Sequence, residues 1–413
     1  MTGLALGEHI AGRISRLAQI SESEAGLTRV FLSREHRQAA GQLMAWMQEA
    51  GMSARVDAIG NVVGRYEGTA AKAPALLLGS HFDSVRNAGQ WDGPLGIITA
   101  IACVADLNRR AKRLPFAIEI AAFADEEGVR FPATLLGSRA LAGTFDERAL
   151  SLRDRDGTSM REAMQSFGLD PEHIGAAARA KGEFLAYLEL HIEQGPVLEA
   201  EGLPVGVVTA ISGATRLLVT LEGMAGHAGT VPMAMRRDAL TGAAECIVAI
   251  ERQCRDDIGL FGTVGMVRAE PGATNVIPGR CTFTIDMRCA SDEHRQIGVA
   301  TAVRNIERIA RERGLAPQID VVHEQRTTPC ADWLQAQIAA AIGRQGHRPI
   351  SLPSGAGHDG MAVAAITDIG MIFIRCRGGV SHHPDEHVTE EDAIIGASVL
   401  LDLIEHFQPA ARG

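Results

Sequence analysis

The chain has 413 residues, of which 46% are hydrophobic and only 4% aromatic, so it is long enough for two domains with largely aliphatic cores. Its net charge of −10 argues against nucleic acid and anionic membranes as partners, because both require a basic surface. The seven scattered cysteines form no CxxC pair, and no signal peptide or apolar run of membrane-spanning length is recognised, so we expect a cytoplasmic protein.

The first and last parts of the chain alternate between predicted helices and strands. A helix at 33–51 has Ser33 as its N-cap, and the final helix at 389–407 has Thr389 in the same role. Between them we predict a hairpin at 55–68, a strand at 75–79, a helix at 92–110 with Pro94 in its first turn, and strands at 116–124, 184–190 and 370–376. This alternation is typical of an α/β fold whose mostly parallel sheet is covered by helices.

The middle of the chain follows a different order, βαββαβ, which is the ferredoxin-like α+β arrangement. Its predicted elements are a strand at 215–224, a helix at 236–256, strands at 261–269 and 279–289, a helix at 292–314 and a strand at 316–326. We therefore expect one domain made of residues 1–211 and 328–413, interrupted by an inserted domain at 212–327.

Polar side chains of one chemical kind follow four of the predicted strands. These clusters are His81 and Asp92; Asp125, Glu126 and Glu127; His191, Glu193 and Gln194; and His382, His383, Asp385 and Glu386. Taken singly, each is more simply explained as a solvated loop or a hydrogen-bonded histidine. Together they would meet at the carboxyl edge of one sheet, where buried carboxylates repel one another unless a cation neutralises them.

The residue types narrow the choice of cation. Imidazole and carboxylate without cysteine suit zinc, manganese, cobalt or nickel rather than calcium. Five ligands with one bridging carboxylate would hold two ions about 3.5–4 Å apart and lower the pKa of a bridging water to roughly 7. A free carboxylate beside that water would then act as general base.

Six blocks of sequence carry a family resemblance. They are "GSHFDSVRNAGQWDGPLGI", "FADEEGVRFPATLLGSRALAG", "LHIEQGPVLE", "GMAGHAGTVPMAMRRDAL", "SGAGHDG" and "SHHPDEHV", in this order along nearly the whole chain. The chain resembles the ureidohydrolase branch of the dinuclear aminoacylase-type metallohydrolases, which contains allantoate amidohydrolases, N-carbamoyl-L-amino-acid hydrolases and β-ureidopropionases. The resemblance implies a catalytic dinuclear-metal domain and an inserted domain that serves as lid and as the interface of a homodimer.

The resemblance also assigns roles to single residues. It implies two divalent ions per subunit, manganese or zinc, with the ligands His81, Asp92, Glu127, His191 and His382, of which Asp92 bridges. Glu126 would be the general base, and Asp83 would orient the ring of His81. His383 is the alternative to its neighbour His382.

Implied substrate contacts come from both domains. They are Gln194 on the ureido group, His227 and Asn275 on the developing oxyanion, Arg288 on a substrate carboxylate, and Gly357 and His358 in the pocket wall. His227 would reach the active site of the partner subunit. Without the resemblance, His227 and Arg288 read as a turn residue and a surface residue.

The expected reaction is hydrolysis of a terminal ureido group with release of ammonia and CO2. The segment "NAGQWDGPLGI" together with "DEEGVRF" and the following "LLGSRALAG" resembles allantoate amidohydrolases more than the other members of the branch, although the carbamoylases share much of it. This resemblance implies allantoate as substrate, and hence purine catabolism, with N-carbamoyl-L-amino acids or β-ureidopropionate as alternatives. A catalytically inactive metal-binding scaffold is disfavoured because every implied ligand and the base are present. An exopeptidase on the same fold is disfavoured by "HIEQG" and "GATNVIPG".

Overall fold

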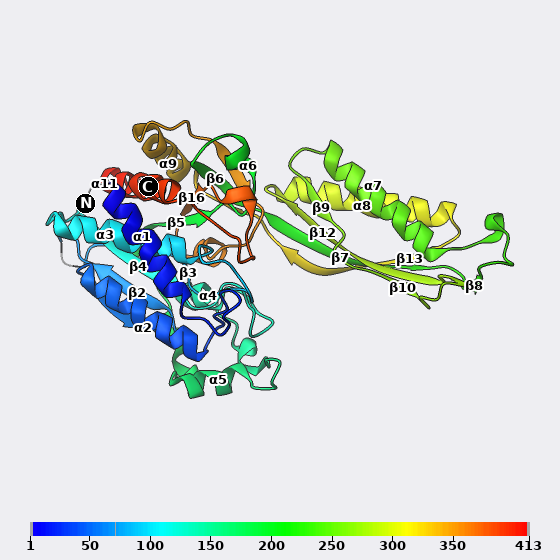
Figure 1. Cartoon of the computed structure of the whole chain (residues 1–413), viewed down its shortest axis with the longest axis horizontal. Helices are drawn as coiled ribbons and strands as arrows, with labels where there is room; N and C mark the ends of the chain where they lie inside the picture. The colour runs from blue at the N-terminus through cyan, green and yellow to red at the C-terminus, as the bar shows by residue number, and fades with distance from the viewer. Residues whose placement is uncertain (1–2, 71, 411–413) are drawn as a thin grey trace. The chain divides into compact units, whose positions relative to one another are not determined.

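The computed structural model describes residues 3–70 and 72–410, which form two compact units (Figure 1). Unit 1 consists of Met1–Thr209 and Pro329–Gly413, and unit 2 of Ala210–Thr328. The chain thus leaves unit 1 once and returns to it. Within the described residues, no helix is both long and apolar enough to cross a membrane.

Unit 1 is built on a nine-stranded sheet. Its strand order is β1-β2-β4-β3-β5-β16-β6-β14, with β15 beside β6. The strands are β1 (Ser53–Val56), β2 (Val62–Tyr66), β3 (Ala75–His81), β4 (Ala117–Phe123), β5 (Phe184–Ile192), β6 (Val205–Ile211), β14 (Thr328–Pro329), β15 (Ser351–Ser354) and β16 (Ile369–Ile374). The four central strands β4, β3, β5 and β16 are parallel, whereas the β1–β2 hairpin and β6 are antiparallel to their neighbours. This confirms the expected mostly parallel sheet.

Helices pack around this sheet. They are α1 (Gly3–Ala18), α2 (Arg34–Glu49), α3 (Pro94–Arg109), α4 (Leu136–Leu141), α5 (Met160–Phe167), α6 (Val197–Ala200), α9 (Asp332–Arg344), α10 (Gly360–Val363) and α11 (Glu390–His406). The predicted caps are confirmed, since Ser33 accepts from the N–H of His36 and Thr389 from that of Asp392. Helix α3 contacts β3, β4 and β5 on one side and α1 and α11 on the other, so it is buried almost all round.

Two glycines bring α3 close to the sheet. A Cβ on Gly96 would lie 2.3 Å from the carbonyl oxygen of Leu190 in β5. Gly93, with a φ of +82°, begins the helix against His81, and a Cβ there would lie 2.6 Å from the Cε1 atom of that ring. The start of α3, and therefore Asp92, is held beside the last residue of β3.

Unit 2 is an antiparallel sheet packed against two helices. It contains β7 (Gly213–Glu222), β8 (Gly226–His227), α7 (Ala239–Asp256), β9 (Phe261–Thr263), β10 (Val267–Glu270), β11 (Val276–Ile277), β12 (Arg280–Cys289), α8 (Asp292–Glu312) and β13 (Ala316–Gln325). The sheet order is β10-β12-β7-β13, with β9 also beside β12, while β8 and β11 form a separate two-stranded ribbon. Burial alternates along β12, as expected of a sheet with one face on the helices.

The prediction of a single strand at 261–269 is wrong, because the structure has two strands there. Thr263 pairs with Asp286 and Val267 with Phe283, so three residues of this segment face only two of β12. The extra residue is a β-bulge, which divides the segment into β9 and β10. The bulge depends on how this segment pairs with β12, which the sequence of the segment does not reveal.

We predict that Gly96→Ala destabilises unit 1 by about 1–3 kcal/mol, because the new methyl group would overlap the main chain of β5. Gly12→Ala in α1 is the matched control, since no atom lies within 4 Å of its Cβ position. That change should leave stability equal or raise it by up to ~1 kcal/mol. All three tryptophans, Trp46, Trp91 and Trp333, belong to unit 1, so urea unfolding followed by tryptophan fluorescence measures the difference. Equal urea midpoints of unfolding for Gly96→Ala and Gly12→Ala would show that the close contact between Gly96 and β5 is not required.

Candidate metal centre

Two histidine rings and one carboxylate converge at the carboxyl edge of the parallel strands. His81 ends β3, His191 lies near the end of β5, and Asp92 precedes α3. The Nε2 atoms of His81 and His191 lie 3.6 and 3.1 Å from the same atom, Asp92 Oδ1. The three side chains are at most 4% exposed, so this meeting point is buried.

The tautomers of the two rings are fixed by main-chain carbonyl groups. His81 Nδ1 lies 3.1 Å from the carbonyl oxygen of Asp83, and His191 Nδ1 lies 2.9 Å from that of Ile192. A carbonyl oxygen only accepts, so Nδ1 carries the hydrogen and Nε2 of a neutral ring presents a lone pair. Among the described residues, neither His191 Nε2 nor Asp92 Oδ1 has a hydrogen-bond partner. Lone pairs therefore meet at a buried point, and a divalent cation stabilises such an arrangement.

The second oxygen of Asp92 faces a different pair of groups. His382 Nε2 lies 3.1 Å from Asp92 Oδ2 and 3.4 Å from Glu127 Oε1. Asp92 therefore belongs to two clusters of possible ligands, one with His81 and His191 and one with Glu127 and His382. This is the position expected of a carboxylate that bridges two cations. Glu126 completes a third group with His81 and Glu127.

The structure distinguishes His382 from its neighbour. The ring of His383 turns toward Asp385, with 3.6 Å between Nδ1 and Oδ2, whereas His382 points at Asp92. His382 and Gln194 both have left-handed main-chain conformations, with φ values of 57° and 56°. Such conformations are unfavourable for residues other than glycine and concentrate at functional sites. Both side chains contact Asp92 Oδ2.

The carboxyl groups of the centre differ in their protonation equilibria. Burial, with a smaller contribution from Asp92, raises the pKa of Glu127 to about 7. Burial also raises the pKa of Glu126 well above its usual value, and the charge of Glu127 adds to this shift. Asp92 is the opposite case: against the effect of burial, His191, His382 and His81 hold its pKa well below the usual range.

Three buried carboxyl groups near the centre received no individual role from the sequence, although one of them, Asp125, belongs to a predicted cluster. They are Asp125, Glu189 and Asp359, each at most 1% exposed. Glu189 accepts from Ser80 Oγ at 3.1 Å and from the Tyr187 hydroxyl at 2.9 Å. Burial, followed by the charge of Glu189, raises the pKa of Asp359 well above normal, against smaller opposing effects of His81 and Ser138. A glutamate inside the otherwise apolar run "FLAYLEL" was a usable signal, whereas Asp359 gave none.

Asp83 supports two parts of the site. Its carbonyl oxygen faces His81 Nδ1, and its carboxylate lies 3.4 Å from the same nitrogen. The carboxylate also accepts hydrogen bonds from the main-chain N–H groups of Glu126, at 3.0 Å, and Glu127, at 3.2 Å. Asp83 thus orders the loop of the two glutamates in addition to contacting His81, the one role expected of it.

The other predicted contacts within unit 1 lie close to the centre. Gln194 Nε2 donates to Asp92 Oδ2 at 3.1 Å. A Cβ on Gly357 would lie 3.6 Å from Glu126 Oε1. His358 is buried behind His191, with ring centroids 4.5 Å apart, and its Nε2 pairs with Ser354 Oγ at 2.7 Å.

The remaining predicted contacts lie in unit 2. Strands β8 and β11 pair His227 with Val276, and the carbonyl oxygen of Asn275 accepts from the N–H of Ala228, so His227 and Asn275 are near neighbours. His227 Nδ1 accepts from the N–H of Gly229 at 3.0 Å, which leaves Nε2–H of a neutral ring as a donor. Arg288 on β12 places its Nε and one terminal nitrogen on Asp286, at 2.9 and 3.1 Å.

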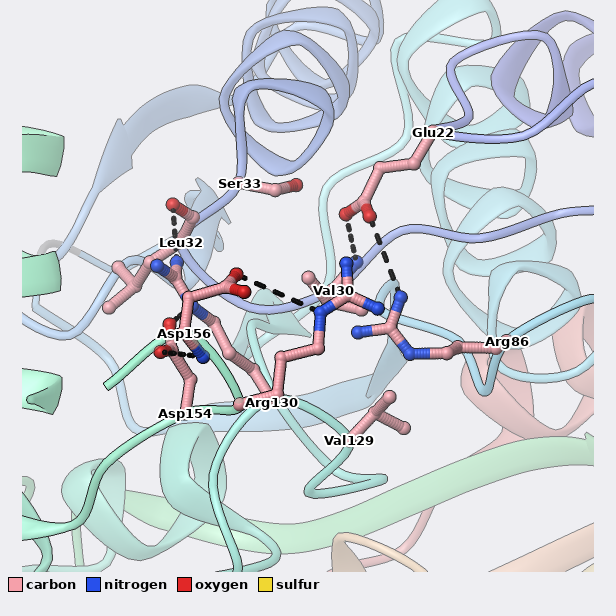
Figure 2. A pocket seen from close by; sticks show the side chains of 10 residues that line it. Glu22, Val30, Leu32, Ser33, Arg86, Val129, Arg130, Asp154 and Asp156 are labelled. Atoms are coloured by element: carbon pink, nitrogen blue, oxygen red, sulfur yellow. Dashed lines mark hydrogen bonds and ion pairs between the residues drawn. The ribbon is translucent and has the colours of Figure 1, made fainter. Parts of the chain in front are cut away.

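Unit 1 also contains a separate pocket, whose lining side chains are drawn in Figure 2. Its volume is about 460 Å³. Its lining residues are Glu22, Val30, Leu32, Ser33, Arg86, Val129, Arg130, Asp154, Arg155 and Asp156. Arg130 donates to Asp154 and to the carbonyl oxygens of Phe31 and Leu32, and Arg86 faces Glu22 at 3.8 Å. The charges in this pocket therefore compensate one another, and no residue of the metal centre lines it.

Comparison with known proteins identifies the class of this chain. The model of peptidase family M20/M25/M40 matches residues 77–406, so the chain belongs to this family. Enzymes of this family are metal-dependent, in agreement with the ligand groups found here. Within the family the chain is an amidohydrolase, as its relatives indicate.

Two curated relatives and two solved structures cover nearly the whole chain. An N-carbamoyl-L-amino acid amidohydrolase of Geobacillus stearothermophilus is 43% identical over 96% of this chain and 98% of its own length. An allantoate deiminase of Arabidopsis thaliana is 40% identical over 97% of this chain and 82% of its own length. A hydantoinase/carbamoylase-family amidase from Burkholderia multivorans has a TM-score of 0.90 at 32% identity, covering 96% of this chain and 97% of its own. AtUAH in complex with glyoxylate has a TM-score of 0.77 at 34% identity, covering 97% of each chain.

We predict that His382→Ala lowers the metal content of the protein and that the adjacent His383→Ala does not. The reason is that only the first change removes an imidazole beside Asp92 and Glu127. Elemental analysis after dialysis against manganese should find about two ions per chain in the wild type and in His383→Ala, and about one in His382→Ala. A lower metal content in His383→Ala than in His382→Ala would show that His383, and not His382, is the ligand.

Proposed function

We propose that the chain hydrolyses the terminal ureido group of a small carboxylate-bearing substrate and releases ammonia and CO2. The observation that carries this proposal is the convergence of His81 Nε2, His191 Nε2 and His382 Nε2 on the two oxygens of the buried Asp92. Relatives at about 40% identity, named for N-carbamoyl-L-amino acids and for allantoate, support the ureido class of substrate.

The donor set fits two divalent cations, manganese or zinc. His81, Asp92 and His191 would hold one, and Asp92, Glu127 and His382 the other. When bound, such ions supply Lewis acidity and lower the pKa of a coordinated water. Their charge would also stabilise the carboxylate form of Glu127, against the burial that raises its pKa.

Glu126 would move the proton. It adjoins the ligand Glu127, lies within the same cluster and faces Gly357, a position with no side chain to block substrate. Glu126 takes a proton from the attacking water as the new C–O bond forms at the carbamoyl carbon. It then delivers this proton to the leaving nitrogen as the C–N bond breaks, and the carbamate product decomposes to CO2 and ammonia.

Unit 2 would supply the polar contacts to the substrate. The Nε2–H of His227, with Asn275 beside it, stabilises the oxyanion, and Arg288 pairs with the substrate carboxylate. We further propose that the protein is a homodimer in which His227 serves the partner's site. Exposed apolar surface supports this, because all exposed large hydrophobic side chains of the described residues except Val56 and Val197 belong to unit 2.

Allantoate is our first candidate substrate, on the motif text around Asp92 and Glu127, and would place the enzyme in purine catabolism. The relative that is 43% identical favours N-carbamoyl-L-amino acids as the second candidate. An ammonia-release assay with added manganese distinguishes these two candidates. Its substrates are allantoate, N-carbamoyl-L-methionine, β-ureidopropionate and ureidoglycolate. Ammonia release from none of the four, by fully metal-loaded protein, would overturn the proposed function.

Glu126→Gln should lower kcat by roughly 10²–10⁴-fold, because an amide does not accept the proton. Its metal content should stay at the wild-type level, since Glu127 remains in place. Steady-state ammonia release combined with elemental analysis tests both statements. A variant that turns over at the wild-type rate with full metal content would show that Glu126 is not the base.

A mixing experiment tests the role of His227 across the dimer. His227→Ala and Glu126→Gln are each expected to be nearly inactive alone. Subunits exchanged at equal concentrations would form mixed dimers with one intact site, so activity should recover to about a quarter of the wild-type value. No recovery, with subunit exchange verified by mass spectrometry, would show that His227 acts within its own subunit.

A further inference from the structure

Glu386 lies on the loop that carries His382, and its side chain is only 4% exposed. Its Oε1 atom accepts hydrogen bonds from the main-chain N–H groups of Trp91, at 2.7 Å, and Asp92, at 3.0 Å. One carboxylate therefore joins the loop of His382 to the loop of Asp92, although nearly 300 residues separate them in the sequence. The reaction proposed above gives this group no role.

The other oxygen of Glu386 belongs to a network around the side chain of Asp92. Ser381 Oγ lies 3.2 Å from Glu386 Oε2 and 3.1 Å from Asp92 Oδ2. Gln194 Nε2 lies 3.1 Å from both Ser381 Oγ and Asp92 Oδ2. Asp92 is thus connected to Glu386 twice, directly through its main-chain N–H and indirectly through the hydroxyl group of Ser381.

The loop before Asp92 is shaped to admit Glu386. A Cβ on Gly89 would lie 2.3 Å from the Cβ of Glu386 and 2.6 Å from its Oε1. Gly89 is not among the glycines with positive φ, so close approach, and not main-chain conformation, requires a glycine here. Beside this contact, the ring of Trp91 meets that of His387 edge to face, with centroids 6.2 Å apart.

We propose that Glu386 is a positioning residue that fixes Asp92 as the bridging ligand by holding the N–H groups of Trp91 and Asp92. It touches neither substrate nor the reacting atoms and acts through Asp92. The inference rests on the proposed function only in taking the Asp92 cluster as the cation site.

Two measurements without substrate test this role. In Glu386→Ala, the amide hydrogens of Trp91 and Asp92 lose their acceptor, so in the metal-free protein they should exchange with deuterium at least about tenfold faster. Titration of metal-free protein with Mn²⁺ and with Zn²⁺ should show roughly 10–100-fold weaker binding, as found for residues that orient metal ligands. Gly89→Ala, which displaces the carboxylate without removing it, should reproduce both effects.

Two further variants serve as controls. Glu386→Gln keeps a carbonyl oxygen for the two N–H groups and should remain within about threefold of the wild type in both measurements. Asp385→Ala, on the same loop with an 82% exposed side chain, should match the wild type. Unchanged exchange and metal affinity in Glu386→Ala would overturn the proposal, and so would a Glu386→Gln variant as impaired as Glu386→Ala. A protein that passed these tests yet hydrolysed no ureido compound would refute the proposed function alone.

Discussion

The centre depends on one electrostatic constraint: lone pairs of several side chains face the same buried carboxylate. Carbonyl groups hold the Nδ1 atoms of His81 and His191, so the Nε2 atoms of both rings are directed at Asp92 Oδ1. His382 approaches the other oxygen of the same carboxylate. In a buried site these groups are stable together only if protons or cations lie between them. The carbonyl contacts favour cations, because they leave Nε2 of a neutral ring free to coordinate.

The fold holds this arrangement in place by close packing. Parallel strands end at a common edge and deliver His81 and His191 there, while α3 begins against His81 because Gly93 has no side chain. Asp83 follows β3 and accepts hydrogen bonds from the main-chain N–H groups of Glu126 and Glu127, so it joins the end of β3 to the loop of these two residues. The Asp92 carboxylate is therefore fixed from several elements at once, a requirement for catalysis by positioned groups.

Much of this architecture was predictable because it follows from local patterns. Apolar runs with polar ends marked the central strands, and Ser33 and Thr389 marked helix starts through their side-chain caps. The bulge between β9 and β10 was missed, since it depends on pairing with β12. Asp359 was missed for a similar reason: its burial beside Glu189 is created by tertiary packing. The choice of His382 over His383 rests on family resemblance and stays a prediction, which the direction of each ring supports.

We propose that Asp92 bridges two cations, and anomalous diffraction from manganese-loaded crystals would locate both of them. We expect two anomalous peaks about 3.5–4 Å apart with the Asp92 carboxylate between them. One peak should lie within coordination distance of His81 and His191, and the other of Glu127 and His382. Crystals that show these side chains clearly, but carry no anomalous peak at Asp92, would show that Asp92 bridges no cations.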